Sequence, residues 1–338
     1  MAAKALFETL SKERQSIMVN LSEIYPYMGP FVATTYFKLI QKTPSLWGYL
    51  YDSPYLSFAH SNLKSLIPGI FFLRIKKLLT ENRVCAVICT HAFASLLASR
   101  EFIGLPHIKR YCVLTDLSAH SFWDKNADAY FVPSAWTKKT LTEKKIREEK
   151  IFITGMPLRG ELISASRLRH RAANSAPVFL LTGGNRGLMA FDEIKNAFLK
   201  SAKRAHLNVL CGENKKLKKT RDKEGSVTFS FFPYQNDVSA LYSSCDCVIG
   251  KPGGLTIFET ALFSKPLIAH SPLPGQEERN LAFLEKSRRC FYASGEKELC
   301  ELINLFYRNK KAFSQRAENL SSLSRPDACR DIVEKILV

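Results

Sequence analysis

A glycine-rich segment in the second half of the chain has the residue types and spacing of a phosphate-binding turn. The segment Gly250–Gly254 reads Gly-Lys-Pro-Gly-Gly, follows the apolar run Cys247–Ile249 and precedes a predicted helix, Leu255–Phe263. Glycines let backbone N–H groups approach a phosphate, and the positive end of a helix dipole favours the anion. The residues of this segment predicted to bind a nucleotide are Lys251, Pro252, Gly253, Gly254 and Thr256, with the diphosphate over Gly253, Gly254 and Thr256. An ordinary glycine-rich turn is the alternative.

Acidic and amide side chains follow this turn at spacings suited to hydroxyl groups. Glu259 lies one turn into the predicted helix, where its carboxylate can face the paired hydroxyls of a ribose. The segment Pro274–Asn280 follows the predicted strand Leu267–His270; a Pro-Gly turn comes first, and Gln276 and Glu277 then open a helix. A neighbouring amide and carboxylate supply donors and acceptors for a sugar ring. A charged, solvated helix start is the alternative for this segment.

Two further turns end predicted strands in the same half of the chain. One follows the strand Val178–Thr182, and the other follows Val227–Phe231 and is suited to a nucleobase. The residues of these two turns that are predicted to bind the same ligand are Thr182, Gly183, Gly184, Asn185, Tyr234 and Gln235, and Asn280 joins them from the Pro-Gly segment.

The elements that position these turns alternate between short apolar runs and helical patterns, which predicts parallel α/β architecture. The strands predicted in the first half are Val84–Cys89, Tyr111–Thr115, Ala129–Val132 and Ile151–Thr154. Those predicted in the second half are Val178–Thr182, Asn208–Cys211, Val227–Phe231, Cys247–Ile249, Leu267–His270 and Cys290–Tyr292. We expect two Rossmann-like, doubly wound domains, residues 1–158 and 159–320, facing a cleft, with a C-terminal helix, 321–338, packing back on the first domain.

Composition limits the function classes. The 338 residues suffice for two domains, and a 46% hydrophobic and 24% charged composition is that of a globular protein. No apolar stretch is long enough to span a bilayer and none resembles a signal peptide. Nine cysteines without a Cys-x-x-Cys pair predict buried thiols in a reducing compartment and no metal site. The net charge of +18 requires an anionic partner, and no nucleic-acid-binding motif accompanies it.

One segment of the first half, Asn62–Leu79, mixes apolar and basic residues. Two interpretations explain the pattern equally well. One is a core helix with basic ends, and the other is a helix lying on an anionic membrane, where each nearby Lys or Arg contributes about 1 kcal/mol. Under the second interpretation the residues that meet the membrane are Phe71, Phe72, Arg74, Lys76 and Lys77. Trp123, which lies outside this segment, is a further candidate for contact with the membrane or the acceptor.

In residue type, order and spacing, these segments resemble glycosyltransferase family 28, specifically its branch of processive diacylglycerol glucosyltransferases and monogalactosyldiacylglycerol synthases. The matching pieces of the second half are Lys251–Gly254, Glu259 and Pro274–Glu277 with Asn280. In the first half, Val113–Asp116 with His120 and Trp123 resembles the family's Thr-Asp-x-x-x-His-x-x-Trp stretch, and Thr154–Arg159 resembles its Thr-Gly-x-Pro-x-Arg.

The resemblance implies a GT-B fold and an inverting transfer of a hexose from a UDP-sugar to diacylglycerol or a related lipid, without a metal or a tightly held cofactor. It implies a UDP-hexose on the second domain, with Glu259 on the ribose and Gln276 and Glu277 on the hexose. The lipid acceptor belongs to the first domain, at the inner face of a membrane. Asp116 is the first candidate to orient or deprotonate the acceptor hydroxyl, and His120 and His91 are weaker candidates.

The chain departs from the family pattern at its start. Family members open with a strand and a glycine-rich loop that ends in a His, whereas Met1–Leu6 already has a helical pattern. We therefore expect an incomplete N-terminus. The alternatives are a transferase of N-acetylglucosamine to a peptidoglycan lipid intermediate and, from another class, a non-catalytic UDP-sugar-binding protein. A nicotinamide dehydrogenase is disfavoured because no G-x-G-x-x-G motif follows an N-terminal strand.

Overall fold

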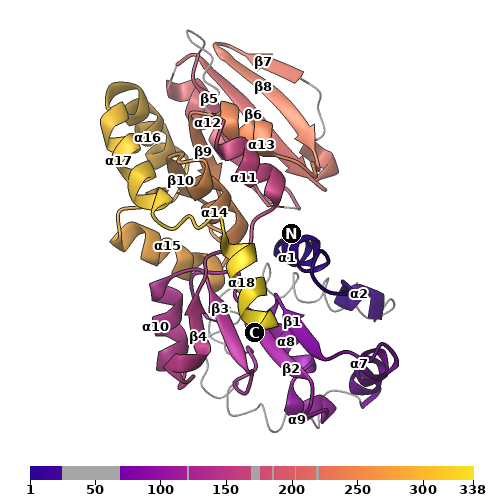
Figure 1. Cartoon of the computed structure of the whole chain (residues 1–338). Coiled ribbons are helices and arrows are strands. Elements are labelled where there is room, and N and C mark those ends of the chain that lie inside the picture. The colour runs from indigo at the N-terminus through magenta and orange to yellow at the C-terminus, as the bar shows by residue number, and fades with distance from the viewer. Residues whose placement is uncertain (25–68, 120–121, 169–175, 185, 202, 218–220) are drawn as a thin grey trace. The chain divides into compact units, whose positions relative to one another are not determined.

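A computed structural model describes residues 1–24, 69–119, 122–168, 176–184, 186–201, 203–217 and 221–338. The chain forms two compact units. The first unit comprises Met1–Pro157, Pro274–Gln276 and Asp327–Val338, and the second comprises Leu158–Leu273 and Glu277–Pro326. Each unit contains one β-sheet with helices packed on it (Figure 1).

The first unit contains a four-stranded parallel sheet of order β1-β2-β3-β4. Its strands are β1 (Ala86–Cys89), β2 (Lys109–Val113), β3 (Ala129–Val132) and β4 (Ile151–Ile153). Every residue of β3 is buried, as a parallel strand covered on both faces requires. Alternate residues of β2 and β3 lie on opposite faces of the sheet: Cys112 and Tyr130 pack in one core cluster, whereas Val113 and Phe131 pack in another.

The helices of the first unit come from both ends of the chain. They are α1 (Ala2–Leu10), α2 (Leu21–Ile24), α7 (Gly69–Glu81), α8 (Ala92–Leu97), α9 (Arg100–Ile103), α10 (Ala135–Glu143), the 3-10 turn η1 (Glu148–Lys150) and α18 (Ala328–Leu337). The C-terminal helix α18 contacts α1 (Figure 1), and Leu6 and Ile332 are buried together against β2 and β3. Among the described residues, no helix is long and apolar enough to cross a bilayer.

The second unit contains a seven-stranded sheet of order β11-β10-β9-β5-β6-β8-β7. Its strands are β5 (Val178–Thr182), β6 (Ala205–Gly212), β7 (Arg221–Glu224), β8 (Val227–Pro233), β9 (Cys247–Gly250), β10 (Leu267–His270) and β11 (Phe291–Ala293). All neighbours are parallel except β7, which pairs antiparallel with β8 at the sheet edge. The carboxyl ends of the six parallel strands therefore lie along one edge of the sheet.

Helices cover this sheet and enclose an aromatic core. They are α11 (Gly160–Ser166), α12 (Phe191–Ser201), η2 (Lys215–Leu217), α13 (Ser239–Ser244), α14 (Gly254–Leu262), α15 (Gln276–Lys286), α16 (Glu296–Arg308) and α17 (Lys310–Ser321). Phe179 of β5 makes edge-to-face contacts with Phe198 and Phe306, at centroid distances of 4.8 and 5.0 Å. These rings join β5 to α12 and α16.

The strand bounds follow the apolar runs closely. The predicted bounds of β3, β5 and β10 coincide with those of the structure, whereas β2 starts and ends two residues earlier than predicted. The strand β7 was not predicted, because Arg-Asp-Lys-Glu has no apolar alternation to indicate a strand. Its polar composition suits an exposed sheet edge.

Candidate functional site

The turns singled out in the sequence follow strands that are neighbours in the second unit's sheet. Gly250, the last residue of β9, is in register with Thr182 of β5 on one side and with Ala269 of β10 on the other. The turn that begins at Tyr234 follows β8, two strands away from β5. The parallel arrangement therefore brings these turns to the same edge of one sheet, where open α/β sheets bind ligands.

Glycines at this edge permit a close backbone approach. A Cβ atom on Gly250 would lie 2.3 Å from the carbonyl oxygen of Thr182, and one on Gly183 would lie 2.7 Å from the backbone of Leu188. The Leu188 N–H donates a hydrogen bond to the Gly183 carbonyl at 2.9 Å, which closes the turn after β5. Gly184 is exposed, with a φ of +68°. Asn185, predicted in the same turn, lies outside the described residues.

The turn after β9 leads directly into helix α14. Gly253 is the N-cap residue and supplies no side-chain capping group, and the first turn of α14 contains no acidic residue. An anion at this helix start would therefore meet backbone N–H groups without a competing carboxylate from the same turn. Thr256 lies in that turn and is 8% exposed. Burial lowers the pKa of Lys251, and the nearby Glu277 carboxylate opposes that shift.

Helix α15 holds two of these turns in place. Asn280 is fully buried, and its Nδ2 donates a hydrogen bond to the carbonyl oxygen of Pro252 at 3.0 Å. Glu277 Oε2 accepts a hydrogen bond from the Leu273 N–H at 2.6 Å, and its Oε1 would lie 3.4 Å from a Cβ on Gly253. Asn280, predicted to bind the donor, thus supports the Lys251–Gly254 turn through Pro252. Gln276 is the first residue of α15 and is half-buried.

Glu259 lies on α14 and is only 9% exposed. Burial raises the pKa of its carboxyl group from the usual 4.5 to about 7, and a hydrogen bond with Tyr242 and the charge of Arg159 oppose that rise. Tyr242 of α13 and Arg159, the N-cap residue of α11, are themselves 1% and 4% exposed. Three helices therefore meet at one buried carboxylate. No sequence pattern indicated Tyr242, which stands in an ordinary short helix.

The remaining donor-side residues differ in exposure. Tyr234 is 43% exposed and follows the last residue of β8, Pro233. Gln235 is half-buried, and Thr182 at the end of β5 is buried. An exposed aromatic ring at the carboxyl end of a strand is a suitable platform for stacking a nucleobase.

In the first unit, His91 and Asp116 follow the neighbouring strands β1 and β2. His91 is the N-cap residue of α8, and its Nδ1 accepts a hydrogen bond from the Phe93 N–H at 3.3 Å. His91 is exposed, yet partial loss of surrounding water lowers the pKa of its ring, and the charge of Asp116 opposes that shift. Asp116 was expected at the end of its strand but lies three residues beyond Val113. His120 lies outside the described residues.

Two aromatic residues predicted to face the membrane or the acceptor are buried in the first unit instead. Phe72 is 8% exposed and stacks on Phe102 with a centroid distance of 4.7 Å, and Trp123 is 7% exposed in the core beside β2 and β3. Burial of a large aromatic ring in such a core stabilises the protein more than its contact with a wet surface would. Arg74, Lys76 and Lys77 are exposed on α7. The side chain of Phe71 lies outside the described residues.

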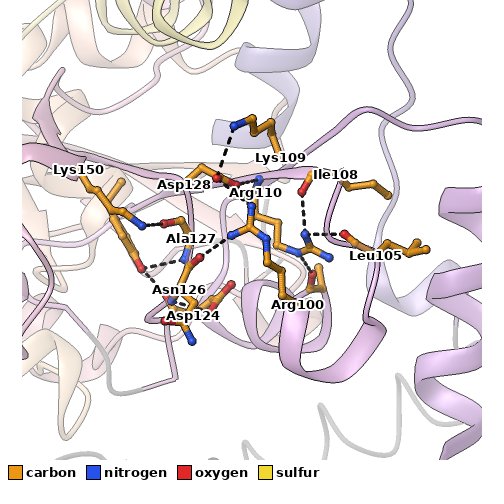
Figure 2. Close-up of polar contacts among 12 residues, drawn as sticks. Arg100, Leu105, Ile108, Lys109, Arg110, Asp124, Asn126, Ala127, Asp128 and Lys150 are labelled. Atoms are coloured by element: carbon orange, nitrogen blue, oxygen red, sulfur yellow. Dashed lines mark hydrogen bonds and ion pairs between the residues drawn. The ribbon is translucent and has the colours of Figure 1, made fainter.

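The first unit also contains a buried charge, Arg110, which lies near the amino ends of its strands, away from His91 and Asp116 (Figure 2). Arg110 is 3% exposed; its guanidinium donates to the carbonyl oxygens of Ala98, Leu105 and Ile108 at 2.7 to 3.0 Å. Asp128 accepts from the Arg110 N–H at 2.8 Å and from Arg100 at 2.6 and 2.8 Å. The described residues contain no group of three or more His, Cys, Asp or Glu that could hold a metal ion.

Two family models match the chain, one in each half. The model of monogalactosyldiacylglycerol (MGDG) synthase matches residues 1–158, and that of the glycosyltransferase family 28 C-terminal domain matches residues 178–325. A processive diacylglycerol beta-glucosyltransferase of Bacillus mycoides (strain KBAB4) is 28% identical over 274 residues, which cover 78% of this chain and 70% of that protein.

Solved structures share the fold at low sequence identity. MurG of Acinetobacter baumannii is similar with a TM-score of 0.59 and 17% identity, over 80% of this chain and 79% of that one. MnaA of S. aureus, in a co-structure with UDP, is similar with a TM-score of 0.58 and 12% identity, over 82% of this chain and 80% of that one. These likenesses confirm the predicted GT-B fold, with parallel sheets in two α/β domains.

Proposed function

Because the chain belongs to glycosyltransferase family 28, with a first domain of the monogalactosyldiacylglycerol-synthase type, we propose that it transfers a hexose from a UDP-sugar to diacylglycerol or a related lipid. The relative from Bacillus mycoides, a processive diacylglycerol glucosyltransferase, supports this acceptor. The structural observation that carries the proposal is the convergence of the turns after β5, β8, β9 and β10 on one sheet edge. The transfer is inverting and needs no metal.

On the donor side, the diphosphate lies over Gly253, Gly254 and Thr256 at the start of α14. As the glycosidic bond breaks, the leaving UDP gains negative charge, and the helix N-terminus with Lys251 stabilises that charge more in the transition state than in the ground state. Glu259 accepts hydrogen bonds from the ribose hydroxyls, and Gln276 and Glu277 bind the hexose.

On the acceptor side, the lipid hydroxyl is oriented by Asp116, which lies with His91 after two adjacent strands of the first unit. Proton removal from the hydroxyl by a positioned base is worth about 10²–10⁴-fold in rate. His91 lies after the adjacent strand, and loss of surrounding water lowers the pKa of its ring, which favours the neutral form that can accept a proton.

For the membrane, the exposed face of α7 offers three cations, Arg74, Lys76 and Lys77, beside Leu73, which is 65% exposed. Arg74 Nη1 donates a hydrogen bond to the Ile24 carbonyl oxygen at 3.0 Å, so this face adjoins the end of α2. The segment before α2 exposes Ile17 and Met18, by 57% and 49%. Cations beside exposed apolar side chains suit peripheral binding to an anionic lipid surface.

The test is a transfer reaction with diacylglycerol vesicles and, separately, UDP-glucose, UDP-galactose or UDP-N-acetylglucosamine, with lipid products identified by mass spectrometry. A hexosyl lipid that disappears in Glu259→Ala supports the proposal and identifies the sugar. Transfer of N-acetylglucosamine only, onto a peptidoglycan lipid intermediate supplied in parallel, would replace it with the peptidoglycan-type reaction. UDP binding without any product would instead indicate a non-catalytic UDP-sugar-binding protein.

A further inference from the structure

The phenol ring of Tyr242 is held in place by packing, independently of the contacts of its hydroxyl. The residue is 1% exposed on α13, and its ring stacks on Phe263 with a centroid distance of 5.5 Å and an interplanar angle of 16°. Phe263 is the C-cap residue of α14, the helix that carries Glu259. Stacking against the end of that helix fixes the position of the phenol oxygen, so that only its proton can rotate.

The Tyr242 hydroxyl donates its single proton in a hydrogen bond to the Glu259 carboxylate. Tyr242 is hydrogen-bonded to Glu259, and the Thr260 hydroxyl lies near the same phenol oxygen. The Thr260 hydroxyl donates to the Thr256 carbonyl oxygen at 2.5 Å, and an ionised carboxylate can only accept. A hydrogen bond to an ionised acceptor is about twice as strong as one between neutral groups. The phenol O–H therefore donates to Glu259 whenever Glu259 is charged.

We propose that Tyr242 is a positioning residue for the nucleotide donor: its buried hydroxyl keeps the Glu259 carboxylate ionised and turned toward the ribose hydroxyls. The inference rests on the proposed function, in which Glu259 binds the ribose. Tyr242 itself is 1% exposed, so it acts on the donor only through that carboxylate.

The need for such a residue follows from the burial of Glu259. With a pKa raised to about 7, the carboxyl group is near its midpoint at neutral pH, and a protonated carboxyl offers one acceptor oxygen fewer to a diol. The groups that hold the charge are the Tyr242 hydroxyl from α13 and the Arg159 guanidinium from the start of α11. When the Tyr242 hydroxyl is removed, the Arg159 guanidinium is the group of this pair that still favours the ionised carboxylate.

The test compares the affinities of UDP and 2′-deoxy-UDP by calorimetry between pH 6 and pH 9, because their ratio isolates the contribution of the ribose hydroxyl. In the wild type we expect the ratio to fall as pH drops through about 7. Tyr242→Phe should move that midpoint about one pH unit upward and lower the ratio several-fold at pH 7, since hydrogen bonds to charged groups contribute about that much. Glu259→Gln should abolish the pH dependence.

Tyr307→Phe is the matched control. Its hydroxyl donates to the Arg204 carbonyl oxygen at 2.5 Å, directly before β6 and thus at the opposite edge of the same sheet, so this variant should keep the wild-type ratio and midpoint. If Tyr242→Phe does not fold, Phe263→Leu removes the stacked ring but keeps the hydroxyl, and it should move the midpoint in the same direction.

A wild-type midpoint and ratio in Tyr242→Phe, with the Glu259→Gln effect intact, would overturn the role of Tyr242 and leave the donor site as proposed. A wild-type ratio in Glu259→Gln would overturn the ribose assignment and Tyr242 with it. Glycolipid synthesis by the wild type, measured on the same preparation, reports separately on the proposed reaction.

Discussion

The side-chain amide of Asn280 donates a hydrogen bond to the carbonyl oxygen of Pro252 at 3.0 Å, inside the protein and across 28 positions of the chain. This contact ties helix α15 to the turn that begins α14. Asn280, which the motif predicts to bind the ligand, therefore supports the backbone of the neighbouring turn. The Lys251–Gly254 turn depends on α15 for its position as well as on its own glycines.

Replacing Asn280 should weaken nucleotide binding through the displaced turn. Asn280→Ala leaves the Pro252 carbonyl without this donor, which costs about 1–3 kcal/mol when the group is buried. We expect roughly a tenfold weaker affinity for UDP in calorimetry. Asn280→Asp should be worse, because a carboxylate repels the carbonyl oxygen.

The control for this prediction is Asn196→Ala, since Asn196 is exposed and donates to Glu296 at the surface at 3.3 Å. It should bind UDP as the wild type does. If Asn280→Ala lowers the melting temperature but leaves UDP affinity unchanged, the contact stabilises the unit without shaping the site.

A methyl group at Gly250 should disrupt the sheet beneath the site. In Gly250→Ala the added Cβ would lie 2.3 Å from the Thr182 carbonyl oxygen, a backbone atom of the adjacent strand that cannot move alone. We expect a loss of about 1–3 kcal/mol or more in the free energy of unfolding, read from chemical denaturation. Gly160→Ala is the matched control, because a Cβ there meets nothing within 4 Å, and it should be neutral or slightly stabilising. Equal stability of both variants would contradict the close approach of β5 and β9.

The glycine-rich turns could be predicted from the sequence because their geometry is local. Each turn follows an apolar strand within a few residues, and adjacent parallel strands then bring such turns to one edge without further information. The roles of Asn280 and Tyr242 could not be predicted, because they depend on which helices meet in space. Phe72 and Trp123 show the same limit: an aromatic residue suits a membrane surface or a core equally well until its neighbours in space are known. The edge strand β7 could not be predicted either, because its pattern is polar.

The buried charge of Glu259 should make the apo protein less stable as pH rises. The folded-state pKa of about 7 lies above the usual 4.5, so between these values the folded protein binds more protons than the unfolded chain. Stability is thus greatest below pH 4.5 as far as this group is concerned, and it falls until pH passes about 7, by roughly 3 kcal/mol at most.

Glu259→Gln tests this dependence. The variant should melt at a higher temperature than the wild type at pH 8, whereas the difference should shrink at pH 5, where the wild-type carboxyl is protonated. Differential scanning calorimetry without nucleotide gives both values. A pH-independent difference between the two proteins would show that the Glu259 carboxyl titrates normally and that its burial has no energetic consequence.

Arg110 should stabilise the first unit without serving donor binding. Arg110→Met keeps the apolar stem but leaves the Ala98, Leu105 and Ile108 carbonyl oxygens without this donor, which should cost about 2–4 kcal/mol. The expected result is a lower melting temperature with unchanged affinity for UDP. Lys109→Met removes an exposed charge 3.9 Å from Asp128 and should change stability by less than about 1 kcal/mol. Equal destabilisation by the two variants would refute the special role of the buried guanidinium.

Reversing two charges on α7 should weaken attachment to anionic vesicles. Lys76 and Lys77 are exposed, and each cation near such a surface contributes about 1 kcal/mol, so the double change to Glu should lower partitioning at least tenfold in flotation assays at low salt. The matched control is Lys215→Glu with Lys216→Glu, an equal change of net charge on exposed residues of the second unit. Binding to neutral vesicles should not distinguish the two variants, because the attraction between the lysines and the lipid is electrostatic and is screened by salt. An equal loss in both variants would show that net charge alone, rather than the face of α7, drives attachment.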